Sequence, residues 1–187
     1  MPLIKICGVT DPETAQFAAE QGADFIGIVF AASSKRCVSV PRGKEIADAA
    51  RSKGAVPVGI FVEHAAEEII AICSETQIAC VQAYRNCDLP AHLARFYLSE
   101  ASPRKGVDFL LMESDQPGTG KTVDWECFVP PAYAEWFLAG GLDSENVEDA
   151  IARFHPFGVD VSSGVERAGK KEKELIEKFI RKVRRYE

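Results

Sequence analysis

The chain has 187 residues, of which 47% are hydrophobic and 27% charged, values typical of one globular domain with a full core. Its formal net charge of -6 argues against nucleic acid or an anionic membrane as a partner. The opening residues lack an apolar run with a cleavage site, and no apolar stretch reaches the roughly 18 residues of a membrane span. We therefore expect a single cytoplasmic domain over residues 1–187, with its six cysteines reduced.

Short apolar runs alternate with amphipathic stretches along the chain, a pattern that predicts a parallel α/β fold. The expected elements, in chain order, are strand Leu3–Cys7, helix Asp11–Gln21, strand Asp24–Phe30, helix Pro41–Gly54, strand Ala55–Val62, helix Ala65–Glu75, strands Ala79–Tyr84, Phe109–Glu113 and Trp136–Ala139, helix Ser144–Phe154, strand Gly158–Ser162 and helix Lys170–Arg185. The helix over 65–75 is expected to carry Ile69, Ile70 and Ile72 on one side.

These runs supply seven strands, and only 24 residues separate Tyr84 from Phe109. Either Ala94–Leu98 is a residual strand there, or one βα unit is degenerate. We predict the α/β class and a (β/α)8 TIM-type barrel whose fifth βα unit is shortened or degenerate. Because the chain is shorter than the roughly 250 residues typical of such barrels, its spacing also fits an open doubly wound sheet.

Alternation along the first and last strands gathers polar side chains on one face of each. Lys5 and Cys7 share a face of the first strand, and Asp160 lies with Ser162 in the last. In a barrel these faces point inward, with Cys7 at the carboxyl end, where barrel enzymes hold their active sites. The ammonium of Lys5 would favour the Cys7 thiolate, the form that acts as a base. The alternative is that Cys7 has no chemical role and packs as a small buried hydrophobic residue.

Two glycine-bearing loops follow the last two predicted strands, Gly140-Gly141-Leu142 and Ser162-Ser163-Gly164. Glycines let backbone amides approach an anion, and the loops after strands seven and eight of barrels often hold a phosphate. We therefore predict a phosphate site here. Arg36, in the loop after the second strand, is either part of a solvated basic loop or a planar fork that grips a carboxylate.

The run Gly118-Thr119-Gly120-Lys121-Thr122 is not a P-loop, because Asp115 stands where that pattern needs a glycine. Asp124, shortly after it, is either a helix N-cap or a cleft acid whose pKa is raised beside Trp125.

The three histidines have no metal-ligand spacing, and the cysteines form no Cys-x-x-Cys pair. The sequence therefore predicts no metal site.

Several runs resemble the phosphoribosylanthranilate isomerases, in the same order from end to end. They are Lys5-Ile6-Cys7-Gly8-Val9-Thr10, Gly22-Ala23-Asp24 through Phe30, Ser34-Lys35-Arg36, Val58 to Val62, Gly118 to Trp125, Ala139 to Leu142 with Glu145-Asn146-Val147, and the most distinctive, Gly158 to Glu166. The resemblance implies a tryptophan-biosynthetic enzyme that converts N-(5-phosphoribosyl)anthranilate to 1-(2-carboxyphenylamino)-1-deoxyribulose 5-phosphate by an Amadori rearrangement. It implies no metal or organic cofactor.

The resemblance also implies the roles of individual residues. Cys7 would be the general base and Asp124 the general acid. Arg36 would hold the anthranilate carboxylate, and Asp160 would meet the substrate's amine or ribose hydroxyls. The phosphate would lie in the two glycine loops, against Gly141, Leu142, Ser162, Ser163 and Gly164. The partner would thus be a phosphorylated small molecule; the sequence carries no signal for the number of chains that associate.

The chain departs from the family at two strand ends. Tyr84 stands where histidine is usual after the fourth strand, and Glu113 where aspartate is usual after the sixth. The middle of the chain is also short. These departures concern the wall near the anthranilate ring. Two alternatives to the isomerase are left open. One is a non-catalytic phosphoribosyl-binding remnant, and the other is a broader isomerase that also accepts the histidine-pathway aminoaldose.

Overall fold

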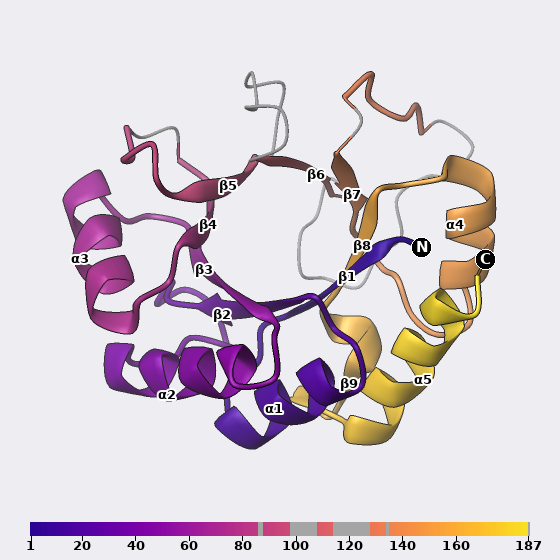
Figure 1. Ribbon diagram of the computed structural model, residues 1–187, viewed down its shortest axis with the longest axis horizontal. Helices are drawn as coiled ribbons and strands as arrows, with labels where there is room; N and C mark the ends of the chain where they lie inside the picture. The colour runs from indigo at the N-terminus through magenta and orange to yellow at the C-terminus, as the bar shows by residue number, and fades with distance from the viewer. Residues whose placement is uncertain (86–87, 98–107, 114–127, 134, 187) are drawn as a thin grey trace.

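A computed structural model describes residues 1–85, 88–97, 108–113, 128–133 and 135–186. Its centre is a closed barrel of eight parallel strands in sequential order, in which β8 pairs with β1 (Figure 1). The strands are β1 (Leu3–Cys7), β2 (Phe25–Val29), β3 (Val56–Phe61), β4 (Cys80–Ala83), β5 (Ala94–Tyr97), β6 (Phe109–Met112), β7 (Trp136–Leu138) and β8 (Gly158–Val161). The barrel prediction is confirmed, and closure rules out an open sheet.

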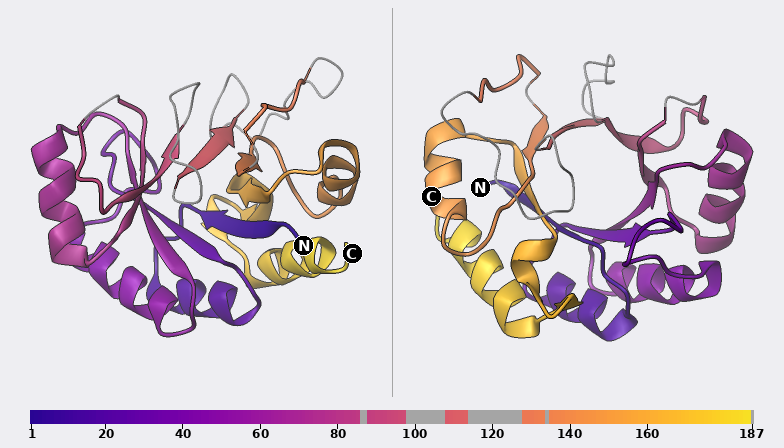
Figure 2. Two further views of the ribbon diagram at one scale, coloured as in Figure 1. Left: turned by 45° about the horizontal axis from the view of Figure 1, so that its top comes forward. Right: turned by 180° about the vertical axis from the view of Figure 1, so that it is seen from behind.

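Helices lie on the outside of the barrel. They are α1 (Pro12–Glu20), α2 (Val40–Arg51), α3 (Ala66–Thr76), α4 (Val147–Phe154) and α5 (Lys173–Arg184). Both views in Figure 2 show α1, α2 and α5 packed side by side along β1 and β2. Within the described residues, the segments from β4 to β7 hold no helix. Residues 98–107, between β5 and β6, where a helix of the fifth unit would lie, are outside the described residues. β5 itself is present, so that unit keeps its strand.

Local sequence explains where the first helices begin and end. Asp11 caps α1 by accepting a hydrogen bond from the Thr14 amide at 2.8 Å, and proline follows at the first helical position. Gly22 then turns the chain with a φ of 108°, a conformation that suits glycine. Ser39 caps α2 in the same way, accepting from the Arg42 amide at 3.4 Å.

Two expectations about helices are wrong in detail. In α3, Ile69 is buried but Ile70 is 39% exposed, because neighbouring residues lie about 100° apart around a helix. The buried stripe continues through Cys73 and Thr76 instead. The last helix begins at Lys173 rather than Lys170, because a hairpin of β9 (Glu166–Arg167) and β10 (Lys170–Lys171) precedes it.

The core has an outer and an inner part. Ile4 and Ile6 of β1 belong to the outer part, which packs the barrel against its helices, as alternation predicts. The inner part is an aromatic plug in which Phe25 contacts Phe96, Phe109 and Phe137 edge to face, with ring centroids 5.4 to 5.7 Å apart. Phe25 and Phe109 of this plug are the first residues of β2 and β6, while the polar residues of the barrel gather toward the carboxyl ends of the strands.

Candidate active site

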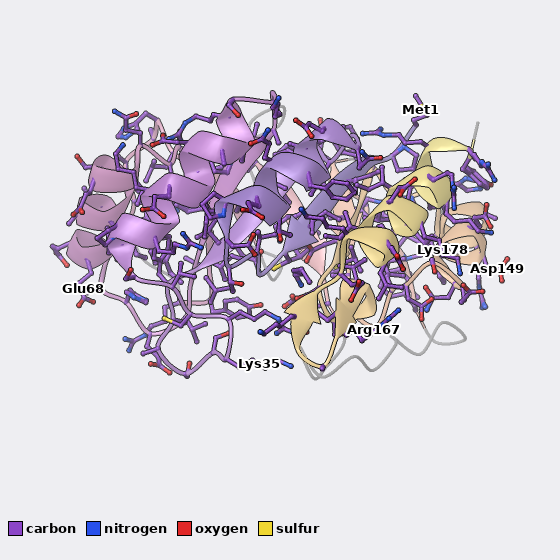
Figure 3. All side chains as sticks on the ribbon, turned by 90° about the horizontal axis from the view of Figure 1, so that it is seen from below. Met1, Lys35, Glu68, Asp149, Arg167 and Lys178 are labelled. Carbon is purple, nitrogen blue, oxygen red and sulfur yellow. The ribbon has the colours of Figure 1, made fainter. Side chains whose placement is uncertain are left out.

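A cavity of about 600 Å³ opens at the carboxyl ends of the strands. Figure 3 shows Lys35, from the loop after β2, and Arg167, from β9, at this end of the molecule and far from Met1. The cavity is lined by residues of nearly every strand end or following loop: Cys7, Val29, Ser33, Ser34, Lys35, Arg36, Ile60, Val62, Gln82, Tyr84, Glu113, Ala139, Gly140, Gly141, Leu142, Asp160, Ser162 and Ser163. Val29, Ile60 and Val62 give it an apolar wall at the ends of β2 and β3, while the loop after β2 adds polar side chains.

At the cavity floor, Asp160 forms an ion pair with Lys5, which is fully buried inside the barrel. The Lys5 ammonium lies 3.0 Å from Asp160 Oδ1 and donates a second hydrogen bond to Gln82 Oε1 at 2.9 Å. Lys5 is fully buried and Asp160 is 6% exposed. Burial alone would lower the pKa of Lys5, but the charge and hydrogen bond of Asp160, together with contributions from Cys7 and Glu113, outweigh it and the pKa is raised. The lysine therefore stays a cation under the cavity.

Cys7 ends β1 and lines the cavity above this pair. Burial raises the pKa of its thiol to about 11, and the Lys5 ammonium opposes that rise, as does Lys171. Lys5 therefore lowers the pKa of Cys7, as expected, but by less than burial raises it. Cys7 keeps partial exposure to the cavity, and its thiolate, rarely formed at neutral pH, is a strong base once formed.

Arg36 reaches over the loop after β1 to a buried carboxylate. Its Nε donates to Glu166 Oε1 at 2.6 Å and its Nη2 donates to Oε2 at 2.9 Å. Lys171 donates to the same Oε1 at 2.8 Å and to the Ser162 carbonyl at 2.9 Å. Gly8 leaves room for this arrangement, because a Cβ there would lie 2.3 Å from Arg36 Cδ. Arg36 is therefore no solvated loop residue.

The two predicted glycine loops meet beside the cavity. Gly140 and Gly141 have φ values of 93° and 65°, which turn the loop after β7 in a way that L side chains rarely adopt. Gly164, after β8, packs on the other loop: a Cβ there would lie 1.9 Å from the Leu142 carbonyl oxygen. Asn146 braces the β7 loop by donating from Nδ2 to the Gly141 carbonyl at 2.9 Å.

The remaining wall carries the two residues that depart from the family pattern. The Tyr84 hydroxyl donates to Glu113 Oε2 at 2.9 Å and accepts from Gln82 Nε2 at 3.2 Å. Burial raises the pKa of Glu113, and Asp160 adds to the rise, while the Tyr84 hydrogen bond opposes it. The departures at 84 and 113 are thus paired with one another across the barrel mouth.

Of the residues predicted for the site, Cys7, Arg36, Gly141, Leu142, Asp160, Ser162 and Ser163 line one cavity. Gly164 lies behind the lining, where it holds the two loops together. Ser162 donates its hydroxyl to the Cys7 carbonyl at 3.0 Å and so ties β8 to β1. Asp124 lies outside the described residues. Among the residues that the structure does describe, no group of three or more His, Cys, Asp or Glu side chains could hold a metal ion.

Sequence reasoning missed Gln82, Glu166 and Lys171 as site residues. Gln82 was detectable, because it points inward by the same alternation that identified Lys5. Glu166 and Lys171 were not, because their meeting depends on the β9–β10 hairpin, and the pattern from Lys170 onward predicts the last helix instead. No helix in the described part of the chain is long and apolar enough to cross a membrane.

Comparison with known proteins identifies the family. A family model described as N-(5'phosphoribosyl)anthranilate (PRA) isomerase matches residues 4–182. The N-(5'-phosphoribosyl)anthranilate isomerase of Chlamydia caviae is 42% identical, over 95% of this chain and 94% of its own length. The chloroplastic isomerase 1 of Arabidopsis thaliana is 34% identical, over 98% of this chain and 75% of its own length.

Solved structures agree with the sequence comparison. The phosphoribosyl anthranilate isomerase of Thermotoga maritima superposes with a TM-score of 0.77 at 29% identity, covering 98% of this chain and 99% of its own. A phosphoribosyl anthranilate isomerase in complex with reduced 1-(o-carboxyphenylamino)-1-deoxyribulose 5-phosphate superposes with a TM-score of 0.72, also at 29% identity, covering 98% of this chain and 99% of its own. The chain therefore belongs to the N-(5'-phosphoribosyl)anthranilate isomerase family.

Proposed function

We propose that this chain, acting as one cytoplasmic domain over residues 1–187, converts N-(5'-phosphoribosyl)anthranilate to 1-(2-carboxyphenylamino)-1-deoxyribulose 5-phosphate in tryptophan biosynthesis. The single observation that carries the proposal is the cavity in which Cys7, Arg36 and Asp160 meet the two glycine loops. Such a cavity offers a base, a carboxylate-binding fork and an anion site to one small molecule.

In this proposal, the two ends of the substrate bind to different groups in the cavity. The backbone amides of the glycine loops hold the phosphate, from Gly141 and Leu142 on one side and Ser163 and Gly164 on the other. Arg36 holds the anthranilate carboxylate, and Asp160 lies near the amine and ribose hydroxyls. The support is that these groups converge on one cavity of about 600 Å³, within the size range of small-molecule sites.

The chemistry requires one acid and one base. Asp124 donates a proton to the ribose ring oxygen, so that the bond from this oxygen to C1 breaks and a Schiff base forms with the ring open. Cys7 then removes the proton from C2, which gives an enolamine. Protonation at C1, with loss of the proton of the C2 hydroxyl, yields the aminoketose. Each transfer by a positioned group contributes typically about 10²–10⁴-fold in rate. The support for Cys7 is its place at the end of β1, where the charges of Lys5 and Lys171 both favour its thiolate.

The test is turnover of freshly generated N-(5'-phosphoribosyl)anthranilate, followed by the loss of anthranilate-type fluorescence. The product is identified as the aminoketose phosphate by mass spectrometry and NMR. We expect turnover by the wild-type chain without added metal, and its loss on Asp124→Asn. No turnover from folded wild-type protein would contradict the proposal and favour a phosphoribosyl-binding remnant, in which Tyr84 and Glu113 would be the first positions to revert.

A further inference from the structure

Glu166 is a buried carboxylate held between two cations, and the proposed reaction gives it no chemical step. Its side chain is 5% exposed. Oε1 accepts hydrogen bonds from Arg36 at 2.6 Å and Lys171 at 2.8 Å, and Oε2 accepts from Arg36 at 2.9 Å. Burial would raise the pKa of Glu166, but the hydrogen bonds from Arg36 and Lys171 outweigh it and lower the pKa to about 2. The group is therefore an anion throughout the neutral range.

The β9–β10 hairpin places this carboxylate. Glu166 and Lys171 are direct cross-strand partners, so their side chains lie on the same face of the hairpin. The turn between the strands, Ala168 and Gly169, has φ values of 51° and 79°, which allows a loop of only two residues. The neighbouring pair, Arg167 and Lys170, lies on the opposite face, and the Arg167 side chain is 66% exposed. The hairpin thus delivers one buried anion to the cavity wall.

Glu166 occupies only one edge of the Arg36 guanidinium. Nε and Nη2 point to the carboxylate, which leaves Nη1 and the second hydrogen of Nη2 on the adjoining edge. Among the residues that the structure describes, none accepts a hydrogen bond from Nη1. Arg36 itself lines the cavity. One guanidinium can bind two carboxylates on two edges, each in a parallel pair of hydrogen bonds.

We propose that Glu166 is a positioning residue that acts through Arg36, fixing the guanidinium so that its remaining edge meets the carboxylate of the substrate. The inference rests on the proposed function, because it needs a carboxylate-bearing ligand in this cavity. A long arginine side chain loses much rotamer freedom when it binds a ligand, and an arginine already held by Glu166 loses less. Glu166 therefore strengthens the binding of ligands with a carboxylate and leaves others unaffected.

Two stable analogues test this directly by titration calorimetry. The first is the reduced product analogue, reduced 1-(o-carboxyphenylamino)-1-deoxyribulose 5-phosphate, and the second is the same molecule without its carboxylate. In Glu166→Gln, an amide of equal size replaces the anion, so Arg36 loses one hydrogen-bond acceptor and its countercharge. We expect the Kd of the first analogue to rise tenfold or more and that of the second to change less than twofold.

Arg167→Gln is the matched control, since it removes a charge from the exposed face of the same hairpin. It should leave both affinities within twofold of the wild-type values. If Glu166→Gln does not fold, Glu166→Asp keeps the charge but shortens its reach, and a selective rise of threefold or more is expected for the first analogue.

The outcomes separate the two proposals. An equal loss of affinity for both analogues would overturn the positioning role, because a general disturbance of the cavity would then explain it. A selective loss would support it. If the wild-type chain bound neither analogue, the proposed function itself would be wrong.

Discussion

Lys5 and Asp160 illustrate what a single pair of residues does for this barrel. Their ion pair lies between the aromatic plug and the cavity, 3.0 Å across and nearly free of water. Either charge alone would strongly destabilise the fold in such a place, since an unpaired buried ion carries a large desolvation penalty. Together with Gln82 they form a polar floor that also places a cation near Cys7.

Lys5→Met should therefore destabilise the protein strongly, by about 3–5 kcal/mol in the free energy of unfolding, because Asp160 is left without its buried partner. Urea denaturation followed by circular dichroism measures this. The double variant Lys5→Met/Asp160→Leu should recover most of the loss, since no buried charge then remains. A loss in the single variant below about 1 kcal/mol, typical of an exposed pair, would show that the pair is not desolvated.

The thiol of Cys7 should ionise at a higher pH than that of an ordinary cysteine. Burial raises its pKa from 9.0 to about 11, and the ammonium groups of Lys5 and Lys171 only partly offset the rise. Because the thiolate is the reactive form, alkylation of Cys7 by iodoacetamide should keep accelerating above pH 9, with its midpoint near 11. Peptide mass spectrometry isolates this site from the other cysteines.

Lys171→Met supplies the comparison for this titration. It removes a charge that lowers the Cys7 pKa, so the alkylation midpoint should move further up. A wild-type midpoint at or below 9 would contradict the burial of the thiol.

At the scale of residues, alternation was an effective predictor wherever a strand was recognised. It identified the inward faces of β1 and β8 and hence Lys5, Cys7 and Asp160. It did not predict the partner of Arg36, because Glu166 lies 130 positions away and approaches only when the barrel closes β8 onto β1. Residues that meet by closure and not by local periodicity leave no short-range pattern in a sequence.

Among the elements, the loops after β7 and β8 depend on one another through Gly164. Gly164→Ala would place a Cβ 1.9 Å from the Leu142 carbonyl oxygen, so the two loops must separate. We expect a loss of about 1–3 kcal/mol in unfolding free energy, as for other overpacked sites. The KM for N-(5'-phosphoribosyl)anthranilate should rise tenfold or more, because the proposed phosphate ligands move apart.

Gly169→Ala is a suitable control for that substitution. Its φ of 79° makes an alanine strained, but no atom lies within 4 Å of the added Cβ. It should reduce stability by about 1 kcal/mol and leave KM within twofold. If Gly164→Ala also left KM unchanged, the two loops would not form a common anion site.

Most elements were predictable because their signals are local. Capping by Asp11, the Gly22 turn and the apolar runs of β1 to β4 all appear within a few residues. The β9–β10 hairpin was missed because its strands are two residues long, and the lysines and glutamates around it favour a helix just as well. The prediction that Ile70 faces the core was also wrong, since three isoleucines in four positions do not define which two face the core.

The whole molecule is a barrel that keeps all eight strands in a chain shorter than most of its class. Closure brings the first and last strands together, and so joins Cys7 to Ser162 and Lys5 to Asp160. Spacing alone did not decide between a closed and an open sheet. Closure depends on the pairing of β8 with β1. These strands lie near the two ends of the chain, so no local sequence pattern predicts that they pair.

The measurement that tests the central claim most directly is the kcat of Cys7→Ala on N-(5'-phosphoribosyl)anthranilate, compared with that of the wild-type chain. If Cys7 is the general base, kcat should fall by about 10²–10⁴-fold, while the melting temperature and the affinity for the reduced product analogue stay close to the wild-type values. A variant that folds, binds the analogue and still turns over at a near-normal rate would contradict the account, because the proton at C2 would then be removed by another group.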